Sequence, residues 1–213
     1  MKKPLLIVLA VLILDQVLKF WIKTHMTIGE EIHVMGNWFI LHFTENEGMA
    51  FGITFGGQAG KLMLSIFRII AVVIIGFYIY RLHKRKAHQG LIITFSLIMA
   101  GALGNIIDSA IYGLIFSQST YHTVATLFPP EGGYGSFLHG KVVDMLYFPV
   151  IDTRLPEWMP IRGGQQFIFF RPVFNIADSA ISAGVILLII FQKRFYHKPP
   201  IEEEKAENQP TID

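Results

Sequence analysis

The 213-residue sequence contains no cysteine, and other common catalytic signatures are missing with it. The lack of cysteine excludes disulfides, thiol nucleophiles and metal sites built on thiolates. The sequence also has no H-E-x-x-H metal motif and no G-x-S-x-G nucleophile elbow. We therefore expect neither a resident metal nor a cofactor. Carboxylates are the main catalytic groups left, with a serine activated by Lys141 as a minor alternative.

Charged residues are also scarce. They make up 16% of the chain, against about a quarter of a soluble domain. Hydrophobic residues reach 52%, and the mean hydropathy is +0.47. A net charge of +2 is too small to indicate a nucleic-acid partner. This balance predicts an integral membrane protein.

Four apolar stretches are long enough to cross a bilayer. They cover about 4–22, 62–80, 91–110 and 173–192. Lysine and arginine gather at residues 2–3, 81–86 and 193–194, so the positive-inside rule places both termini in the cytoplasm. The predicted fold class is membrane α-helical. It has four transmembrane helices, a small extracytoplasmic β-cradle and a long extracytoplasmic loop region.

The segments between the spans differ in character. Residues 23–61 alternate apolar and polar residues and then become rich in glycine, which predicts the β-cradle. Its Met49, Phe51 and Phe55 offer apolar contacts to a lipidated ligand. Residues 111–172 are broken by proline and glycine and read as the outer loop region. We expect residues 1–198 to form a single domain, and the acidic tail 199–213 to be disordered.

Carboxylates recur where the predicted spans reach the outer face. Asn105 and Asp108 have the same i, i+3 spacing as Asn175 and Asp178, so each pair shares one helical face. Asp144 lies in a short apolar segment at the same depth. An ionisable residue inside a membrane is by default a functional-site hypothesis. Two aspartates that share a site hold one proton between them and can hydrolyse a peptide bond with water.

Two other interpretations stay open at this point. The polar residues could serve only as hydrogen-bonding glue between helices. They could also form a membrane carrier or a proton relay. A relay needs polar groups throughout the membrane depth, whereas most of these gather near the outer face.

Five short motifs resemble those of one family, the bacterial lipoprotein signal peptidases, also called signal peptidase II. They occur in the family's order and span most of the chain. The motifs are Asp15-Gln16-x-x-Lys19, Asn46-x-Gly48-x-Ala50-Phe51, Gly101-Ala102-x-Gly104-Asn105-x-x-Asp108, Val142-Val143-Asp144 and Phe174-Asn175-x-Ala177-Asp178-Ser179.

This resemblance implies a membrane aspartyl endopeptidase with Asp144 and Asp178 as its catalytic pair. The implied substrate is a prolipoprotein carrying diacylglycerol, which is cut just before the lipidated cysteine. The implied location is the bacterial inner membrane, with the active site near the outer face. Inhibition by globomycin-type antibiotics, contact with membrane lipid and a monomeric state are expected with it. The residues expected to support or bind substrate are Asp15, Lys19, Asn46, Gly48, Arg68, Asn105, Asp108 and Asn175.

The sequence departs from the family pattern in two ways. Ser109 occupies a position where relatives usually carry arginine, and the segments on both sides of Asp144 are unusually long. Arg68 lies in the second predicted span, where an arginine without a partner would be costly. We therefore expect Arg68 to pair with Asp108 and to supply the missing cation. The alternative is that Arg68 reaches lipid headgroups.

Overall fold

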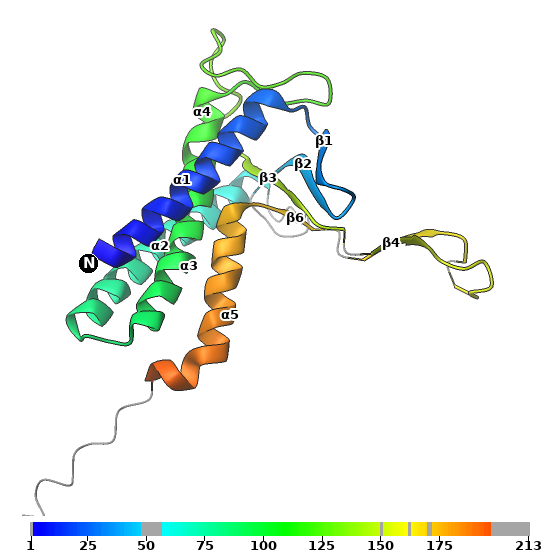
Figure 1. Cartoon of the computed structure of the whole chain (residues 1–213). Helices are drawn as coiled ribbons and strands as arrows, with labels where there is room; N and C mark the ends of the chain where they lie inside the picture. The colour runs from blue at the N-terminus through cyan, green and yellow to red at the C-terminus, as the bar shows by residue number, and fades with distance from the viewer. Residues whose placement is uncertain (1, 48–56, 150, 162, 170–171, 197–213) are drawn as a thin grey trace, which may run out of the picture.

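Four long helices stand side by side in the computed structural model, and a small sheet lies at one end of them (Figure 1). The structure describes residues 2–47, 57–149, 151–161, 163–169 and 172–196. The helices are α1 (Lys2–His25), α2 (Gly57–Lys84), α3 (Gln89–Ile107) and α5 (Ile176–Tyr196). Each is long and apolar enough to cross a membrane. The predicted four-span fold is therefore confirmed for the described part of the chain.

The helix boundaries differ from the predicted ones. Helix α2 begins at Gly57, before the predicted start at Leu62. Helix α3 continues through a π-helix, η2 (Asp108–Tyr112), and the short α4 (Gly113–Ile115). Helix α5 begins only at Ile176, because Val173 and Phe174 form strand β6 and Asn175 caps the helix.

The sheet is assembled from distant parts of the chain. Its strands are β1 (Glu31–Met35), β2 (Phe39–Asn46), β3 (Val142–Tyr147) and β6 (Val173–Phe174), all antiparallel in the order β1-β2-β3-β6. The predicted cradle was confined to 23–61, and β3 was placed in the loop region. Apolar cross-strand pairs explain the difference, because Leu146 lies opposite both Leu41 and Phe174. Strand β3 is thereby fixed next to the start of α5.

Two glycines let α3 approach its neighbours closely. A Cβ atom at Gly101 would lie 2.1 Å from the carbonyl oxygen of Ala177 on α5. A Cβ atom at Gly104 would lie 2.6 Å from Oδ2 of Asp15 on α1. Small residues at helix interfaces permit this kind of packing in membranes. The contacts bring Asp15, Asn105 and the first turn of α5 together.

The main apolar core lies where the sheet meets the helices. Ile22 and Met26 at the end of α1 pack with Phe43 of β2 and with Val143 and Met145 of β3. All five side chains are fully buried or nearly so. Val143 and Met145 alternate with Asp144 along β3, so the core side chains and the carboxylate point to opposite faces of that strand.

The predicted outer loop region contains ordered structure. Residues between Phe116 and Gly140 fold back on η2 and α4, with backbone hydrogen bonds from Gly135 to Gly113 and from Gly140 to Ser109. Strands β4 (Ile151–Arg154) and β5 (Gln166–Phe169) form a separate two-stranded hairpin. Figure 1 shows this hairpin extending sideways from the sheet end of the helices.

Candidate active site

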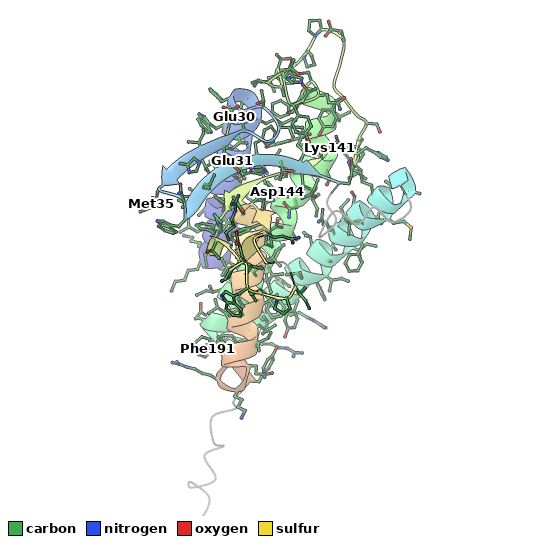
Figure 2. The ribbon with its side chains drawn as sticks, turned by 90° about the vertical axis from the view of Figure 1, so that its right-hand side faces the viewer. Glu30, Glu31, Met35, Lys141, Asp144 and Phe191 are labelled. Carbon is green, nitrogen blue, oxygen red and sulfur yellow. The ribbon has the colours of Figure 1, made fainter. Side chains whose placement is uncertain are left out.

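The side chain of Asn175 links the two aspartates predicted to act together. Its Oδ1 accepts a hydrogen bond of 2.8 Å from the backbone N–H of Asp178, which is the N-cap arrangement of a helix start. Its Nδ2 donates a hydrogen bond of 2.6 Å to Oδ1 of Asp144. One buried amide therefore holds a residue of β3 and the first turn of α5 in fixed relation. Figure 2 shows Asp144 where the sheet meets this turn.

Two further asparagines complete the hydrogen bonds of the pair. Asn105 of α3 donates a bond of 2.7 Å to Oδ1 of Asp178. Asn46, the last residue of β2, donates to Oδ2 of Asp144. Oδ2 of Asp178 has no hydrogen bond to another described residue, and the Asp178 side chain is only half-buried. That oxygen is the one open to a water molecule.

The environment favours a proton on Asp144. This side chain is 3% exposed. Burial, reinforced by the negative charge of Asp178, raises the pKa of Asp144 to about 8. Lys19 and the amide of Asn175 oppose this shift without cancelling it. At neutral pH Asp144 therefore carries a proton, which it can donate to a carbonyl oxygen.

A second group of carboxylates is more deeply buried, and one lysine forms ion pairs with both of its members. Nζ of Lys19 lies 2.9 Å from Oδ2 of Asp15 and 2.8 Å from Oδ2 of Asp108, and all three side chains are buried. The same ammonium group donates to Oδ1 of Asn105 at 2.9 Å. Lys19 therefore balances much of the charge of this group and connects it, through Asn105, to Asp178.

The two carboxylates of this deeper group also bind backbone groups. Oδ1 of Asp15 accepts from the N–H of Ala177 at 2.9 Å, and Oδ2 of Asp108 accepts from the N–H of Val143 at 3.3 Å. Ala177 and Val143 are each adjacent to one aspartate of the catalytic candidate pair. Asp15 and Asp108 therefore position the two backbones that carry Asp178 and Asp144.

The pairing of Arg68 with Asp108 stays a prediction, and Asp108 has a closer described cation than expected. Among the described residues, the cation within ion-pair distance of Asp108 is Lys19. The charge of Arg68 acts most strongly on Asp178, and then on Asp108 and Asp144. Ser109 does not open a place for a cation either, since it is buried and donates to the carbonyl oxygen of Asn105. The charge of Arg68 therefore acts on Asp178 and Asp108 as well as on Asp144.

Other sequence-based expectations fall elsewhere. Gly48, Met49, Phe51 and Phe55 lie outside the described residues. Gln16 was not among the expected site residues, yet it donates to Oδ1 of Asp108 at 2.9 Å and accepts from the Tyr112 hydroxyl. Its place within the Asp15-Gln16-x-x-Lys19 motif was the signal that could have found it.

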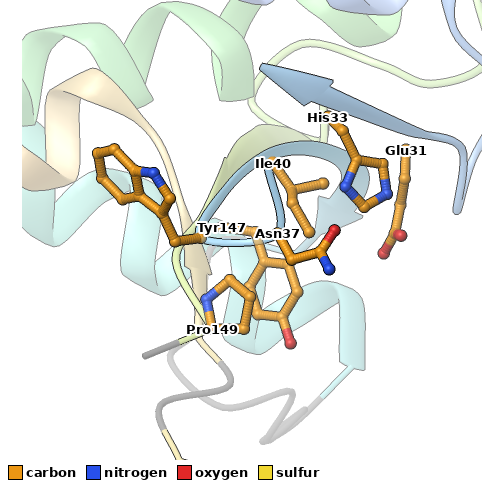
Figure 3. A pocket seen from close by; sticks show the side chains of 7 residues that line it. Glu31, His33, Asn37, Ile40, Tyr147 and Pro149 are labelled. Carbon is orange, nitrogen blue, oxygen red and sulfur yellow. The ribbon is translucent and has the colours of Figure 1, made fainter. Parts of the chain in front are cut away.

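A pocket on the sheet is separate from the aspartate pair. Figure 3 shows its lining, which consists of Glu31, His33, Asn37, Trp38, Ile40, Tyr147 and Pro149. Tyr147 follows Asp144 by an odd number of residues on β3, so the two point to opposite faces of the strand. Within the described ranges, no group of three or more histidine, aspartate or glutamate side chains is arranged to hold a metal ion.

Comparisons with known proteins show which family the chain resembles. The family model described as signal peptidase (SPase) II matches residues 7–193. The lipoprotein signal peptidase of Porphyromonas gingivalis is 50% identical over 192 residues, covering 88% of this chain and 81% of that protein. The lipoprotein signal peptidase of Amoebophilus asiaticus is 41% identical over 203 residues, covering 94% and 81%.

A solved bacterial membrane enzyme has a similar structure. It superposes with a TM-score of 0.59 at 26% identity, covering 100% of this chain and 94% of that one. The fold and the site thus define a multi-pass bacterial membrane enzyme. The chain belongs to the signal peptidase II family, and it is a peptidase.

Proposed function

We propose that this peptidase removes the signal peptide from diacylglyceryl-modified prolipoproteins, cutting just before the lipidated cysteine. Its relatives are named lipoprotein signal peptidases, which supports the substrate class. The observation that carries the mechanism is the bridge through Asn175, which joins Asp144 and Asp178 in one hydrogen-bonded unit. Family membership also favours a peptidase over the membrane carrier or proton relay considered from the sequence.

In this mechanism, Asp178 acts as the general base and Asp144 as the general acid. The open oxygen of Asp178 takes a proton from water as that water attacks the scissile carbonyl carbon. Asp144 donates its proton to the carbonyl oxygen, and a tetrahedral diol forms. The diol then collapses: Asp144 takes back a proton from one diol hydroxyl, the C–N bond breaks, and the proton on Asp178 passes to the leaving amine. No covalent intermediate with the enzyme is formed.

The supporting residues hold this pair in position. Asn46, Asn105 and Asn175 orient the carboxyl oxygens by hydrogen bonds. Asp15, Lys19 and Asp108 fix the backbones on either side. Arg68 adds a positive charge that attracts Asp178. Gly48 is proposed to contact substrate on the strength of its motif alone.

The orientation in the membrane follows from charge. The N-terminus, the α2–α3 connection and the end of α5 all lie at the end of the molecule opposite the sheet (Figure 1). Basic residues gather there, including Lys84 and Lys193 in the last turns of α2 and α5. We therefore place both termini in the cytoplasm and the dyad near the outer face of the inner membrane. We expect a monomer, contact with membrane lipid, and inhibition by globomycin-type antibiotics.

The test is cleavage by the purified protein. With a diacylated prolipoprotein, mass spectrometry of the products should show cleavage before the modified cysteine, and unmodified prolipoprotein should stay intact. Asp144→Asn and Asp178→Asn should each lower turnover by at least about 100-fold without loss of the folded state. Glu131→Gln, at an exposed position in the loop after α4, is the matched control. Near-normal turnover of the Asp178→Asn protein would refute the assignment.

A further inference from the structure

The β4–β5 hairpin is the part of the molecule that the peptidase site does not use. It connects β3 to β6, so both of its ends lead into strands next to the dyad. Among the residues that the structure describes, its two strands pair with each other and not with the four-stranded sheet. A two-stranded hairpin alone is marginally stable in water. The hairpin therefore needs another surface to rest on.

The hairpin's closing loop carries large apolar side chains into solvent. The backbone N–H of Met159 donates to the carbonyl oxygen of Pro156 at 3.1 Å, which forms a tight turn with Trp158 near its apex. Trp158 is 80% exposed and Ile161 is 77% exposed. Exposure of this kind at the tip of a projecting element marks an interaction site. Tryptophan in particular is enriched where membrane and water meet.

The level of the hairpin along the transmembrane helices indicates which surface it contacts. In Figure 1 the hairpin lies level with the first turns of α5. Helix α5 is one of the four spans, and its first turn carries Asp178. An element that extends sideways at this level enters the zone where lipid headgroups surround the protein. A soluble partner would meet the molecule above this zone.

We propose that the β4–β5 hairpin is a membrane-interface anchor, with Trp158 and Ile161 inserted among the lipids of the outer leaflet. Because its two ends continue into β3 and β6, the anchor holds the strands beside Asp144 and Asp178 at the level of the lipid surface. The lipid contact itself does not depend on the proposed reaction.

Fluorescence of a single tryptophan tests this contact directly. The chain has three tryptophans, Trp21, Trp38 and Trp158. Replacing Trp21 and Trp38 with phenylalanine leaves Trp158 as the only emitter. The protein is placed in nanodiscs whose lipids are brominated near the headgroup end of their acyl chains. We expect Trp158 emission to be blue-shifted, quenched by the brominated lipid and insensitive to aqueous iodide.

The matched control places the single tryptophan in another exposed loop. Tyr121 is 73% exposed and lies in the loop after α4, away from the spans. A protein with Trp21, Trp38 and Trp158 replaced by phenylalanine and carrying Tyr121→Trp should show the reverse pattern, with quenching by iodide and not by lipid.

Two outcomes would overturn the proposal. Quenching of Trp158 by iodide without quenching by lipid would place the hairpin in water. Quenching by neither agent would mean that another protein surface covers it. A double variant, Trp158→Ser with Ile161→Ser, gives a second readout, because fluorescence from a dye attached elsewhere on the loop should lose its lipid quenching. Retained lipid quenching in that variant would also count against insertion of these two side chains.

Discussion

The segments Asn105-x-x-Asp108 and Asn175-x-x-Asp178 have the same spacing, yet their aspartates lie in opposite environments. Asp108 follows the end of α3, is fully buried, and contacts the ammonium group of Lys19 at 2.8 Å. Asp178 lies in the first turn of α5, is half-buried, and keeps one oxygen open among the described residues. The difference shows that spacing places polar groups on one face, whereas the nearest cation and the helix end decide what they do.

The two asparagines differ in the same way. Asn175 caps α5, so its amide is committed to the backbone of Asp178 and to Asp144. Asn105 lies in the last turn of α3 and joins the two groups, since it accepts from Lys19 and donates to Asp178. The deeper group is thus structural support, and the group at the start of α5 is left able to exchange protons.

The largest effect is expected from removing the cation of the deeper group. Lys19→Met leaves Asp15 and Asp108 buried without their shared partner, which should cost about 3–5 kcal/mol of folding stability. Thermal unfolding in detergent measures this loss. Lys193→Met, at an exposed position in the last turn of α5, is the control and should change little. Adding Asp108→Asn to Lys19→Met should restore part of the stability. Full stability of the Lys19→Met protein would contradict the supporting role.

The next effect concerns pH. Because the pKa of Asp144 is raised to about 8, its proton is present at neutral pH and is lost as the pH rises through that value. The value of kcat/KM should therefore fall by roughly tenfold per pH unit on the alkaline side. A rate that keeps rising through alkaline pH would indicate a single ordinary base.

The raised pKa of Asp144 also makes the stability of the folded protein depend on pH. The unfolded carboxyl group ionises near pH 3.9, so stability gained from the neutral form is complete below that pH and is lost as the pH rises through about 8. The wild-type Tm should fall between about pH 4 and about pH 8. In Asp144→Asn the fall should be smaller, because the amide does not ionise. Equal falls in both proteins would argue against a proton held on Asp144.

The smallest effect is expected at Arg68. Its charge acts on Asp178 through electrostatic attraction, so Arg68→Ala should reduce turnover by less than about tenfold. Arg68→Lys keeps the charge and should retain most of the activity. Arg81→Ala, at the opposite end of α2, is the control. Equal losses in the alanine and lysine variants would mean that shape, and not charge, matters at this position.

Much of the fold could be predicted from hydropathy and charge alone. Span lengths and the positions of basic residues predict four helices, and these are the features that the bilayer imposes. The sheet was harder, because β3 and β6 are short and their pairing partners lie far away in the chain. Leu146 lies opposite both Leu41 and Phe174. Both partners are distant in the sequence, so the residues around Leu146 do not indicate these pairings.

Prediction of the site from the sequence was limited in the same way, because its contacts join distant parts of the chain. The motifs predicted which residues gather, including Asp15, Lys19 and Asn175. They did not predict which cation meets which carboxylate. The i, i+4 spacing of Asp15 and Lys19 is enough to indicate their ion pair, whereas the distance between Lys19 and Asp108 is set by how α1 packs on α3. Close approach at Gly104 creates that geometry, and it is visible only once the helices are assembled.

The most direct test is infrared titration of the shared proton. Difference spectra of the purified protein should contain a band from one protonated carboxyl group that disappears with a midpoint near pH 8, as the raised pKa of Asp144 requires. The band should be missing in Asp144→Asn. In Asp178→Asn its midpoint should move to lower pH, because the neighbouring negative charge is gone. A band that survives unchanged in Asp144→Asn would contradict the account, since the proton would then lie on another group.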